Sequence, residues 1–210
     1  MSKVLFITAN PKSVESSISL GLGEKFLKHY KETNHKDEVV LIDLYKTNIP
    51  EIDYELLYVI ENMKKGISLE NLPVQTRNQF ERFNSFTEQF VQADKYIFVT
   101  PMWNLGFPAR LKSYIDTICI AGKTFRYTPD GPQGLLKDKK CLHIHASGGF
   151  HSKDPMNHAD KYLKDIMQFM GVADYKSIVV EGHSAIPDRA ETIIAKAHTE
   201  IPAVVEWFAV

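Results

Sequence analysis

A hydroxyl-rich segment follows the first strand-like run of the chain and leads into a helical pattern. It extends from Asn10 to Ser19, and four serines fall within its last seven residues. Serines placed before a helix can cap its free N–H groups, and that role alone accounts for one or two of them. A helix start also binds anions, because unpaired N–H groups and the positive end of the helix dipole meet there. The segment therefore predicts a phosphate site with Ser17 and Ser19 as hydroxyl donors, with capping as the alternative.

A second loop combines a large aromatic side chain with an amide. It reads Pro101-Met102-Trp103-Asn104-Leu105-Gly106-Phe107-Pro108 and follows another strand-like run. A tryptophan in a solvent-facing loop is unfavourable unless something covers it. The isoalloxazine ring of a flavin is flat and apolar with a polar edge, which matches the contacts that Trp103, Leu105 and Asn104 offer. The alternative is that Trp103 packs under a neighbouring insertion of the chain.

A third loop contains adjacent glycines, in the sequence Ala146-Ser147-Gly148-Gly149-Phe150. Glycine lets the backbone turn sharply and approach a ligand closely, with its N–H groups unobstructed. A turn that needs a positive φ uses glycine just as readily. The pair supports a ligand site because all three loops follow strands, and ligands of open α/β sheets bind beyond the carboxyl ends of the strands.

Five short apolar runs are expected to form the strands that position these loops. They are Val4 to Thr8, Val39 to Leu44, Tyr96 to Thr100, Cys141 to Ala146 and Ile178 to Glu181. Four of them are rich in β-branched residues and are typical of buried strands. The run from Cys141 to Ala146 alternates apolar and polar residues, so we expect that strand to be less covered on one face.

Segments with helical spacing separate these runs. The last of them runs from Pro187 to Phe208 and opens with a proline suited to a first turn. The other four each have an apolar stripe: Leu20, Phe26, Leu27 and Tyr30; Phe80, Phe83, Phe86 and Phe90; Leu111, Tyr114, Ile115 and Ile118; and Tyr162, Leu163, Ile166 and Phe169. Alternating strands and helices call for parallel strands joined by right-handed crossovers. The sequence predicts an α/β protein with a five-stranded parallel sheet in the flavodoxin-like order 2-1-3-4-5 and helices on both faces.

Two stretches exceed what this minimal fold requires. Residues 49 to 74 are expected to form an irregular excursion with a short helix from Tyr54 to Lys64. Residues 121 to 138 are expected to project from the core as a strand-like piece and a tight turn at Pro129-Asp130-Gly131-Pro132. The length of 210 residues predicts one domain over residues 1–210.

Composition excludes several classes of protein. With 25 Lys plus Arg against 26 Asp plus Glu, the net charge of -1 implies no surface for binding nucleic acid. The first loop has neither G-x-G-x-x-G nor G-x-x-x-x-G-K-[ST], so it indicates neither a nicotinamide Rossmann site nor a nucleotide triphosphatase. The start of the chain has no signal-peptide pattern and no apolar run is long enough to span a membrane, so we expect a soluble, cytoplasmic protein.

The cysteines and histidines indicate no metal site. Cys119 and Cys141 each lie in an apolar stretch, which favours buried thiols over a disulfide or a metal site. His143 and His145 share one face of a strand, a spacing found at metal sites, but no third ligand stands in an obvious relation to them. Structural or solvent-facing roles are therefore favoured over metal binding.

Several segments together carry a resemblance that covers essentially the whole chain. They are Met1-Ser2-Lys3-Val4-Leu5, Asp37-Glu38-Val39-Val40, Asp43-Leu44, Pro101-Met102-Trp103-Asn104, Ala121-Gly122-Lys123-Thr124-Phe125-Arg126-Tyr127-Thr128, Gly131-Pro132-Gln133-Gly134-Leu135, Gly148-Gly149 and Glu181-Gly182-His183. The chain resembles the FMN-dependent NADH-azoreductases, also described as FMN-dependent NADH:quinone oxidoreductases, of the flavodoxin-like superfamily. The P-x-[WY]-N element combined with A-G-x-T-F-[RK]-Y-T is specific, whereas the glycine pair alone is not.

The resemblance implies a homodimer with one FMN per subunit near the subunit interface. The flavin contacts that it implies are Asn10, Ser17, Ile18 and Ser19 at the phosphate and ribityl chain, and Pro101, Met102, Trp103, Asn104, Leu105, Ala146, Ser147, Gly148 and Gly149 around the ring. The chain departs from the family pattern at two positions. Asn10 stands where a serine is common, and Ser147 stands where an arginine is common. The second departure removes a cation from the neighbourhood of the cofactor.

The hypothesis that follows is an oxidoreductase with a ping-pong cycle. NADH or NADPH reduces the bound FMN and leaves, and a quinone or azo compound then takes the electrons, so no catalytic side chain is needed for hydride transfer. Gly148 and Gly149 are the candidate N–H donors to the reduced flavin. Phe125, Tyr127 and Phe150 are candidates for the walls of the acceptor pocket, with packing at the subunit interface as the alternative.

Two other classes of protein remain as alternatives. One is a flavodoxin-type electron carrier, which binds FMN without turning over small substrates; the near-zero charge and the two insertions count against it. The other is a flavin-free regulatory module on the same fold.

Overall fold

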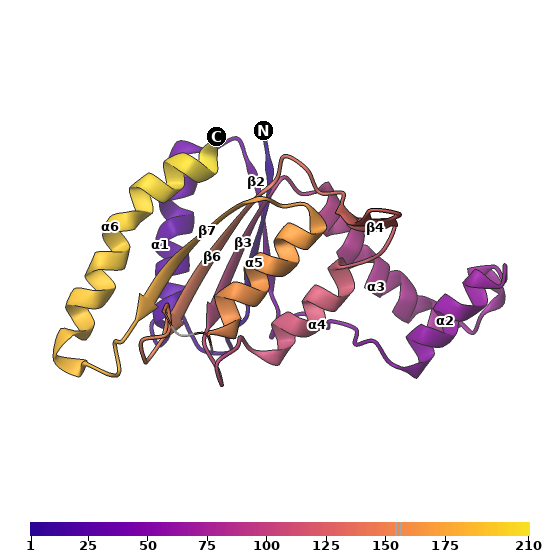
Figure 1. Cartoon of the computed structure of the whole chain (residues 1–210), viewed down its shortest axis with the longest axis horizontal. Helices are drawn as coiled ribbons and strands as arrows, with labels where there is room; N and C mark the ends of the chain where they lie inside the picture. The colour runs from indigo at the N-terminus through magenta and orange to yellow at the C-terminus, as the bar shows by residue number, and fades with distance from the viewer. Residues whose placement is uncertain (154, 156) are drawn as a thin grey trace.

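A five-stranded parallel sheet forms the centre of the molecule in the computed structural model, which describes residues 1–153, 155 and 157–210 (Figure 1). Its strands are β1 (Lys3–Thr8), β2 (Glu38–Asp43), β3 (Lys95–Pro101), β6 (Lys140–Ser147) and β7 (Asp174–Glu181). Their order in the sheet is β2-β1-β3-β6-β7. Since β4 and β5 lie outside this sheet, the order equals 2-1-3-4-5 counted along the chain, and the predicted flavodoxin-like α/β fold is confirmed.

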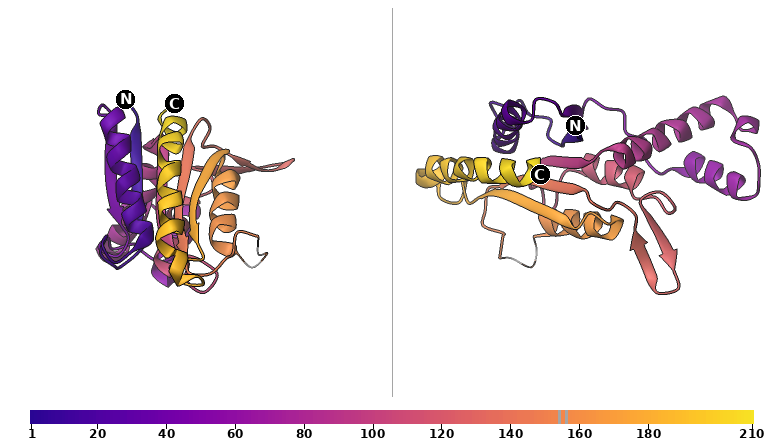
Figure 2. Two further views of the ribbon diagram at one scale, coloured as in Figure 1. Left: turned by 90° about the vertical axis from the view of Figure 1, so that its left-hand side faces the viewer. Right: turned by 90° about the horizontal axis from the view of Figure 1, so that it is seen from above.

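Helices cover both faces of the sheet (Figure 2). The helical elements are α1 (Ile18–Thr33), α2 (Tyr54–Lys64), η1 (Leu69–Asn71), α3 (Val74–Gln92), α4 (Ala109–Ile118), α5 (His158–Met170), η2 (Pro187–Arg189) and α6 (Ala190–Ala209). One core cluster joins the sheet to α1 and α6, and a second joins it to α3, α4 and α5. The predicted helix over Tyr54 to Lys64 is confirmed, whereas Pro187 opens a short 3-10 turn instead of the last α-helix itself.

The second strand was predicted to be buried, and that prediction is wrong; the fifth is buried only at alternate residues, Ile178 and Val180. β2 and β7 are the two edges of the sheet, and only one residue of β2, Ile42, is buried. Leu41 of β2 is 63% exposed. A run of β-branched and apolar residues does not reveal whether a strand has one neighbour or two.

The fourth strand, β6, was predicted to be less covered on one face, and that prediction is wrong. Seven of its eight residues are buried, and His143 and His145 are 0% and 1% exposed. The physical reason is that polar partners are buried with the histidines. Asp160 on α5 lies 2.8 Å from Nδ1 of His143, and the Thr100 hydroxyl on β3 lies 2.9 Å from its Nε2. Buried polar groups with hydrogen-bond partners are tolerated in a core.

The second insertion forms the predicted projection. β4 (Phe125–Thr128) and β5 (Gly131–Gly134) pair antiparallel around a tight turn. The base of this hairpin is fixed to the end of α5, because the Leu136 N–H donates to the Met170 carbonyl at 2.9 Å. Gly134 packs so closely on Gly171 that an added Cβ would lie 2.3 Å from the Gly171 nitrogen. The hairpin is therefore held at the amino-terminal edge of the sheet, away from the strand ends that carry the three loops (Figure 1).

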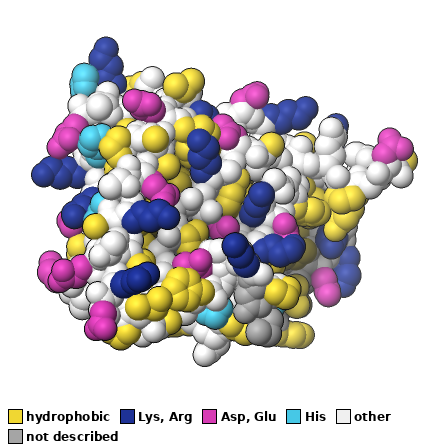
Figure 3. All heavy atoms as spheres, turned by 60° about the vertical axis from the view of Figure 1, so that its left-hand side comes forward, with side chains coloured by type: hydrophobic (Ala, Val, Ile, Leu, Met, Phe, Trp, Pro, Cys, Tyr) yellow, Lys and Arg dark blue, Asp and Glu magenta, His cyan; other side chains and the backbone are white. Residues whose placement is uncertain are grey.

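The surface carries charges of both signs. On the face shown in Figure 3, Lys and Arg side chains are interspersed with Asp and Glu. Both cysteines are free thiols; Cys141 is buried and Cys119 is partly exposed. In the described part of the chain, no helix is both long enough and apolar enough to cross a membrane.

The buried His145 should make folding sensitive to acid. Burial, and then the charge of His143, lower the pKa of His145 from 6.5 to about 3. Between these two values the unfolded chain binds a proton that the folded protein does not, so the free energy of unfolding falls as the pH falls. Urea denaturation across this interval should show a less steep fall for His145→Gln, because glutamine does not titrate. Parallel curves for the variant and the wild-type protein would contradict this account.

Candidate cofactor site

Loops that follow four parallel strands enclose a cavity of about 230 Å³ at the carboxyl edge of the sheet. It is lined by Asn10, Lys12, Ser16, Ser17, Ile18, Ser19, Pro101, Met102, Trp103, Ala146, Gly148, His183 and Ser184. The loops after β1, β3 and β6, which the sequence singles out, therefore meet at one place. The loop after β7 joins them there.

The start of α1 forms one end of this cavity. Ser17 is the N-cap residue, and its Oγ accepts the Leu20 N–H at 3.3 Å and Nδ2 of Asn10 at 2.8 Å. Both acceptor positions of that oxygen are then used, so its own hydrogen points to Ser19 Oγ at 3.2 Å. The hydroxyl hydrogen of Ser19 is left for a ligand. Ser17 therefore acts as the helix cap, and the predicted contact with a phosphate is left to Ser19.

Backbone donors and a cation add to this end of the cavity. In the part of the chain that the structure describes, the N–H groups of Ile18 and Ser19 have no acceptor, as expected for the first turn of a helix. Lys12 lies on the wall of the same cavity, and its backbone N–H donates to Oδ1 of Asn10 at 3.1 Å. Unpaired N–H groups, one free hydroxyl hydrogen and one ammonium group fit a phosphate.

The loop after β3 makes a strained two-residue turn. The N–H of Trp103 donates to the Gly106 carbonyl at 2.9 Å, and the reverse bond measures 3.0 Å. Asn104 and Leu105 between them have positive φ angles of 50° and 66°, which is uncommon for leucine. Residues held in such conformations cluster at ligand sites, where the surrounding structure enforces them. The turn leaves Trp103 41% exposed beside the cavity, with its ring edge-to-face against Tyr45.

The glycine loop after β6 is held by hydrogen bonds from two sides. The Met102 N–H donates to the Ala146 carbonyl at 2.7 Å and joins this loop to the loop after β3. The N–H groups of Ser184 and Ala185 both donate to the Gly148 carbonyl, at 3.1 and 3.0 Å. Within the described residues no acceptor pairs with the N–H of Gly148 or of Gly149. These two donors are therefore free for a ligand.

Ser147 holds the glycine loop together from within. Its side chain is 4% exposed, and its hydroxyl donates to the Gly149 carbonyl at 3.0 Å. The hydroxyl thus stabilises the loop itself. It supplies no positive charge to the cavity.

Glu181 and Gly182 fix the far end of the glycine loop. The Glu181 carboxylate accepts the N–H groups of His151 and Ser152, each at 2.8 Å. Burial alone would raise the pKa of Glu181, but these hydrogen bonds outweigh it and hold the pKa below its usual value. Gly182 has a φ of +83°, and the Phe150 ring lies where its Cβ would be. The Phe150 side chain is placed by this contact and remains 55% exposed.

The structure brings most of the predicted cofactor residues together, but not all of them. Asn104, Leu105, Ser147 and Gly149 belong to the loops around the cavity without lining it. Four lining residues were missed by the sequence analysis: Lys12, Ser16, His183 and Ser184. The signal for the last two was available, because β7 is parallel to β6 and its carboxyl end must reach the same edge of the sheet.

Of the three residues predicted to wall an acceptor pocket, Phe125 and Tyr127 lie together on the hairpin, with ring centroids 5.4 Å apart, and Phe150 lies elsewhere, in the glycine loop. Phe125 is 6% exposed and also packs on Phe169, and Tyr127 is 75% exposed. The hairpin adjoins the last residues of α5, and the first residue of α5, His158, donates to the Leu105 carbonyl at the cavity edge of the sheet. A helix of 13 residues is about 20 Å long, so this distance separates the hairpin from the loops.

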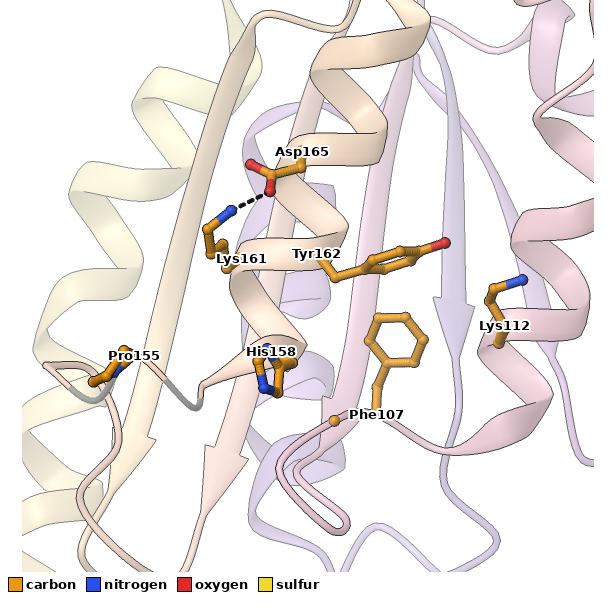
Figure 4. Close-up of a pocket in the computed structure, with 8 residues that line it drawn as sticks. Phe107, Lys112, Pro155, His158, Lys161, Tyr162 and Asp165 are labelled. Carbon is orange, nitrogen blue, oxygen red and sulfur yellow. Dashed lines mark hydrogen bonds and ion pairs between the residues drawn. The ribbon is translucent and has the colours of Figure 1, made fainter.

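A larger groove of about 520 Å³ lies beside the strained turn, between α4 and α5 (Figure 4). Phe107 and Tyr162 form its aromatic part, with ring centroids 5.6 Å apart. Lys112 and Lys161 stand at its sides, and each is paired with an aspartate on its own helix. The groove offers flat apolar contacts next to the loop that carries Trp103. Over residues 1–153, 155 and 157–210, no three His, Cys, Asp or Glu side chains lie together as a metal site would require.

The parallel sheet with its cavity at the carboxyl edge defines a protein of the flavodoxin-like class, and the family model described as flavodoxin-like fold matches residues 2–205. A relative from Geotalea uraniireducens (strain Rf4), named FMN-dependent NADH:quinone oxidoreductase, is 50% identical over 99% of this chain and 100% of its own. A second relative of that name, numbered 2, from Bacillus subtilis (strain 168) is 45% identical over 92% of this chain and 93% of its own. The chain belongs to the family of FMN-dependent NADH:quinone oxidoreductases.

Solved structures agree with this assignment. An azoreductase from Bacillus anthracis str. Sterne is 39% identical and superposes with a TM-score of 0.91, over 99% of this chain and 100% of that one. An FMN-dependent NADH-azoreductase from Bacillus anthracis str. Ames Ancestor, solved in complex with FMN, is 32% identical with a TM-score of 0.93 over the whole of both chains.

Gly182→Ala tests whether this glycine positions the loop. The new methyl group would lie 2.2 Å from the Phe150 ring, so the ring must move, and the hydrogen bond from the Gly182 N–H to Gly149 should weaken. Gly66→Ala is a matched control, because Gly66 has a φ of +84° and nothing within 4 Å of its Cβ position. We expect the control to lose about 1 kcal/mol of stability from backbone strain. Gly182→Ala should lose more and also bind FMN more weakly; equal losses and unchanged FMN affinity would show that the Phe150 contact has no role.

Proposed function

We propose that the chain is a single FMN-binding domain over residues 1–210 and an oxidoreductase that passes electrons from NADH through bound FMN to quinones and azo compounds in a ping-pong cycle. The observation that carries the proposal is the convergence of free donors from α1, of Trp103 and of two free glycine N–H groups on one edge of the sheet. Family membership and the names of the relatives support the same activity. Free thiols in a charge-balanced chain are consistent with a place in the cytoplasm.

The residues at the start of α1 hold the phosphate in this proposal. The N–H groups of Ile18 and Ser19 and the hydroxyl of Ser19 donate to it, and Lys12 adds a positive charge. Asn10 and Ser17 act on the phosphate indirectly, because their mutual hydrogen bond orients the Ser17 cap. Because these donors are already in place, the protein does not have to reorganise when the cofactor binds.

The two ring loops orient the flavin. Pro101, Met102 and Trp103 provide apolar contact, and Asn104 and Leu105 shape the turn beneath them. Ala146 and Gly148 line the other wall, where the N–H groups of Gly148 and Gly149 would donate to the polar edge of the ring and stabilise negative charge there. When bound, FMN supplies the redox chemistry by taking two electrons from NADH and returning them to the acceptor.

The acceptor site requires a second copy of the chain in this proposal. The groove between α4 and α5 gives one wall, with Phe107 and Tyr162, and Phe150 stands at the adjacent loop. Phe125 and Tyr127 are too far from the loops of their own chain to contribute there. In a homodimer, the projecting hairpin of one subunit can reach the cavity edge of its partner.

An oxidoreductase and an electron carrier differ in their reaction with NADH. In anaerobic stopped-flow mixing of the FMN-loaded protein with NADH, we expect rapid bleaching of the flavin absorbance without any added reductase. Subsequent mixing with a quinone should restore the colour. A flavin that stays oxidised in NADH but is reduced by a separate reductase would identify the protein as a carrier of the flavodoxin type, and a protein that takes up no FMN would support the flavin-free module.

Alanine substitutions should separate the two serines of the phosphate end. Ser19→Ala removes a donor to a charged group, which is worth about 1.5 to 3 kcal/mol, so the FMN dissociation constant should rise by about tenfold to 100-fold. The free energy of unfolding without FMN should barely change, because Ser19 is not the cap. Ser17→Ala should lower both FMN affinity and stability. Ser13 is exposed, so Ser13→Ala is the control; titration of FMN fluorescence that gives equal affinities for all three variants would refute the phosphate assignment.

A further inference from the structure

A chain of buried polar groups runs beneath the two ring loops. The Asp160 carboxylate lies 2.8 Å from Nδ1 of His143, whose Nε2 lies 2.9 Å from the hydroxyl of Thr100. The same hydroxyl lies 3.3 Å from Nδ1 of His145. Nε2 of His145 is buried and has no hydrogen-bond partner among the described residues. A chain of four polar side chains thus ends on one open ring nitrogen.

The donors and acceptors of this chain can be assigned by counting hydrogens. Burial would raise the pKa of Asp160, but the hydrogen bonds from His143 and Tyr175 keep it low, so Asp160 is a carboxylate that only accepts. Nδ1 of His143 therefore donates. If His143 is neutral, its Nε2 accepts from Thr100, Thr100 accepts from Nδ1 of His145, and Nε2 of His145 presents a lone pair.

A proton that enters at Nε2 of His145 can cross this chain without any large movement. It binds the lone pair, the Nδ1 hydrogen of His145 passes to Thr100, and the Thr100 hydrogen passes to Nε2 of His143. The result is a His143 imidazolium next to the Asp160 carboxylate, with His145 again neutral. His145 itself does not retain the proton, because burial, and then the charge of His143, lower its pKa to about 3.

The chain is joined to both walls of the candidate site. Thr100 pairs with His145 in the sheet register, and the next residues, Pro101 and Ala146, pair with each other and both belong to the ring loops. Pro101 and Ala146 also line the cavity. On the other side, Asp160 lies in the first turn of α5, the turn whose His158 lines the groove beside Phe107. The chain therefore connects the strand ends that carry the ring loops to the first turn of α5.

The reaction itself creates a need for a proton. NADH gives up a hydride, which is two electrons and one proton, whereas a quinone takes two electrons and two protons to become a hydroquinone. One further proton must therefore be supplied in each turnover. We propose that Asp160, His143, Thr100 and His145 form a relay that stores this proton as the His143 imidazolium and delivers it through Nε2 of His145, by way of a bound water molecule, to the acceptor. This inference rests on the proposed function.

The other groups that face the relay come from every element packed on it. Tyr175 and Ser177 on β7 donate to Asp160 at 2.8 and 3.3 Å, and they stabilise the carboxylate. His151, in the loop after β6, interacts electrostatically with His145. Cys141 on β6 is buried, and burial raises its pKa well above its usual value, so it stays a neutral thiol. Asp160 is therefore the one negative charge among these groups.

Substitution of Thr100 tests the relay with a matched pair of variants. Thr100→Val keeps the shape but removes the hydroxyl, and Thr100→Ser keeps the hydroxyl. In stopped-flow experiments, reduction of the flavin by NADH should be unchanged in both, because that step consumes no extra proton. Reoxidation by a quinone above neutral pH should be about tenfold slower in Thr100→Val and largely restored in Thr100→Ser. The solvent deuterium isotope effect on reoxidation should change in the valine variant alone.

A second readout does not depend on turnover. Nitrogen-15 NMR of histidine-labelled protein should show wild-type His145 protonated at Nδ1, and Thr100→Val should lose this preference. Asp160→Asn provides an independent variant, since asparagine keeps an oxygen for His143 and Tyr175 but cannot stabilise the imidazolium. This variant should also slow reoxidation.

If NADH does not reduce the wild-type flavin, the proposed function is wrong. If reduction is normal but valine and serine variants reoxidise equally fast with equal isotope effects, the relay is wrong and the proposed function stands.

Discussion

The unpaired N–H groups at the start of α1 are the constraint around which the molecule is arranged. A helix cannot satisfy the donors of its own first turn, and a parallel sheet brings every such helix start and every strand end to the same edge. Here α1 follows β1 and begins at the centre of that edge, beside the loops after β3, β6 and β7. An anion at this point would accept hydrogen bonds from donors that otherwise bond only to water, which supports our proposal of a ligand with a phosphate at one end.

Hydrogen bonds within and between the loops determine which donors remain for a ligand. The Ser17 cap leaves the Ser19 hydroxyl for the ligand, and the residues after β7 hold the glycine loop so that two N–H groups remain free. Leu105 is kept at a positive φ by the paired hydrogen bonds of Trp103 and Gly106. Beneath these loops, buried polar groups connect β3, β6 and α5. The rigid sheet therefore supports both the orientation of a cofactor and the proposed path for a proton.

The sequence was sufficient for the fold and for three of the four loops at the cavity. Apolar runs predicted the strands of the sheet, and the serines predicted where α1 begins, because both signals are local; the anion site itself stays a prediction. Burial of β6 was mispredicted because the partners of His143 come from Thr100 and Asp160, 43 and 17 residues away. The position of Phe125 and Tyr127 depends on the hairpin packing against the end of α5, which no local pattern contains. Which strands are edges, and hence the exposure of Leu41, also follows only from the assembled sheet.

Comparison of FMN with riboflavin tests whether the start of α1 holds a phosphate, because riboflavin has the same ring and ribityl chain but no phosphate. Fluorescence titration of the cofactor-free protein gives both dissociation constants. We expect FMN to bind at least about 100-fold more tightly than riboflavin, since two or more hydrogen bonds to a charged group are lost with the phosphate. Equal affinities for the two flavins would show that the start of α1 does not hold the phosphate.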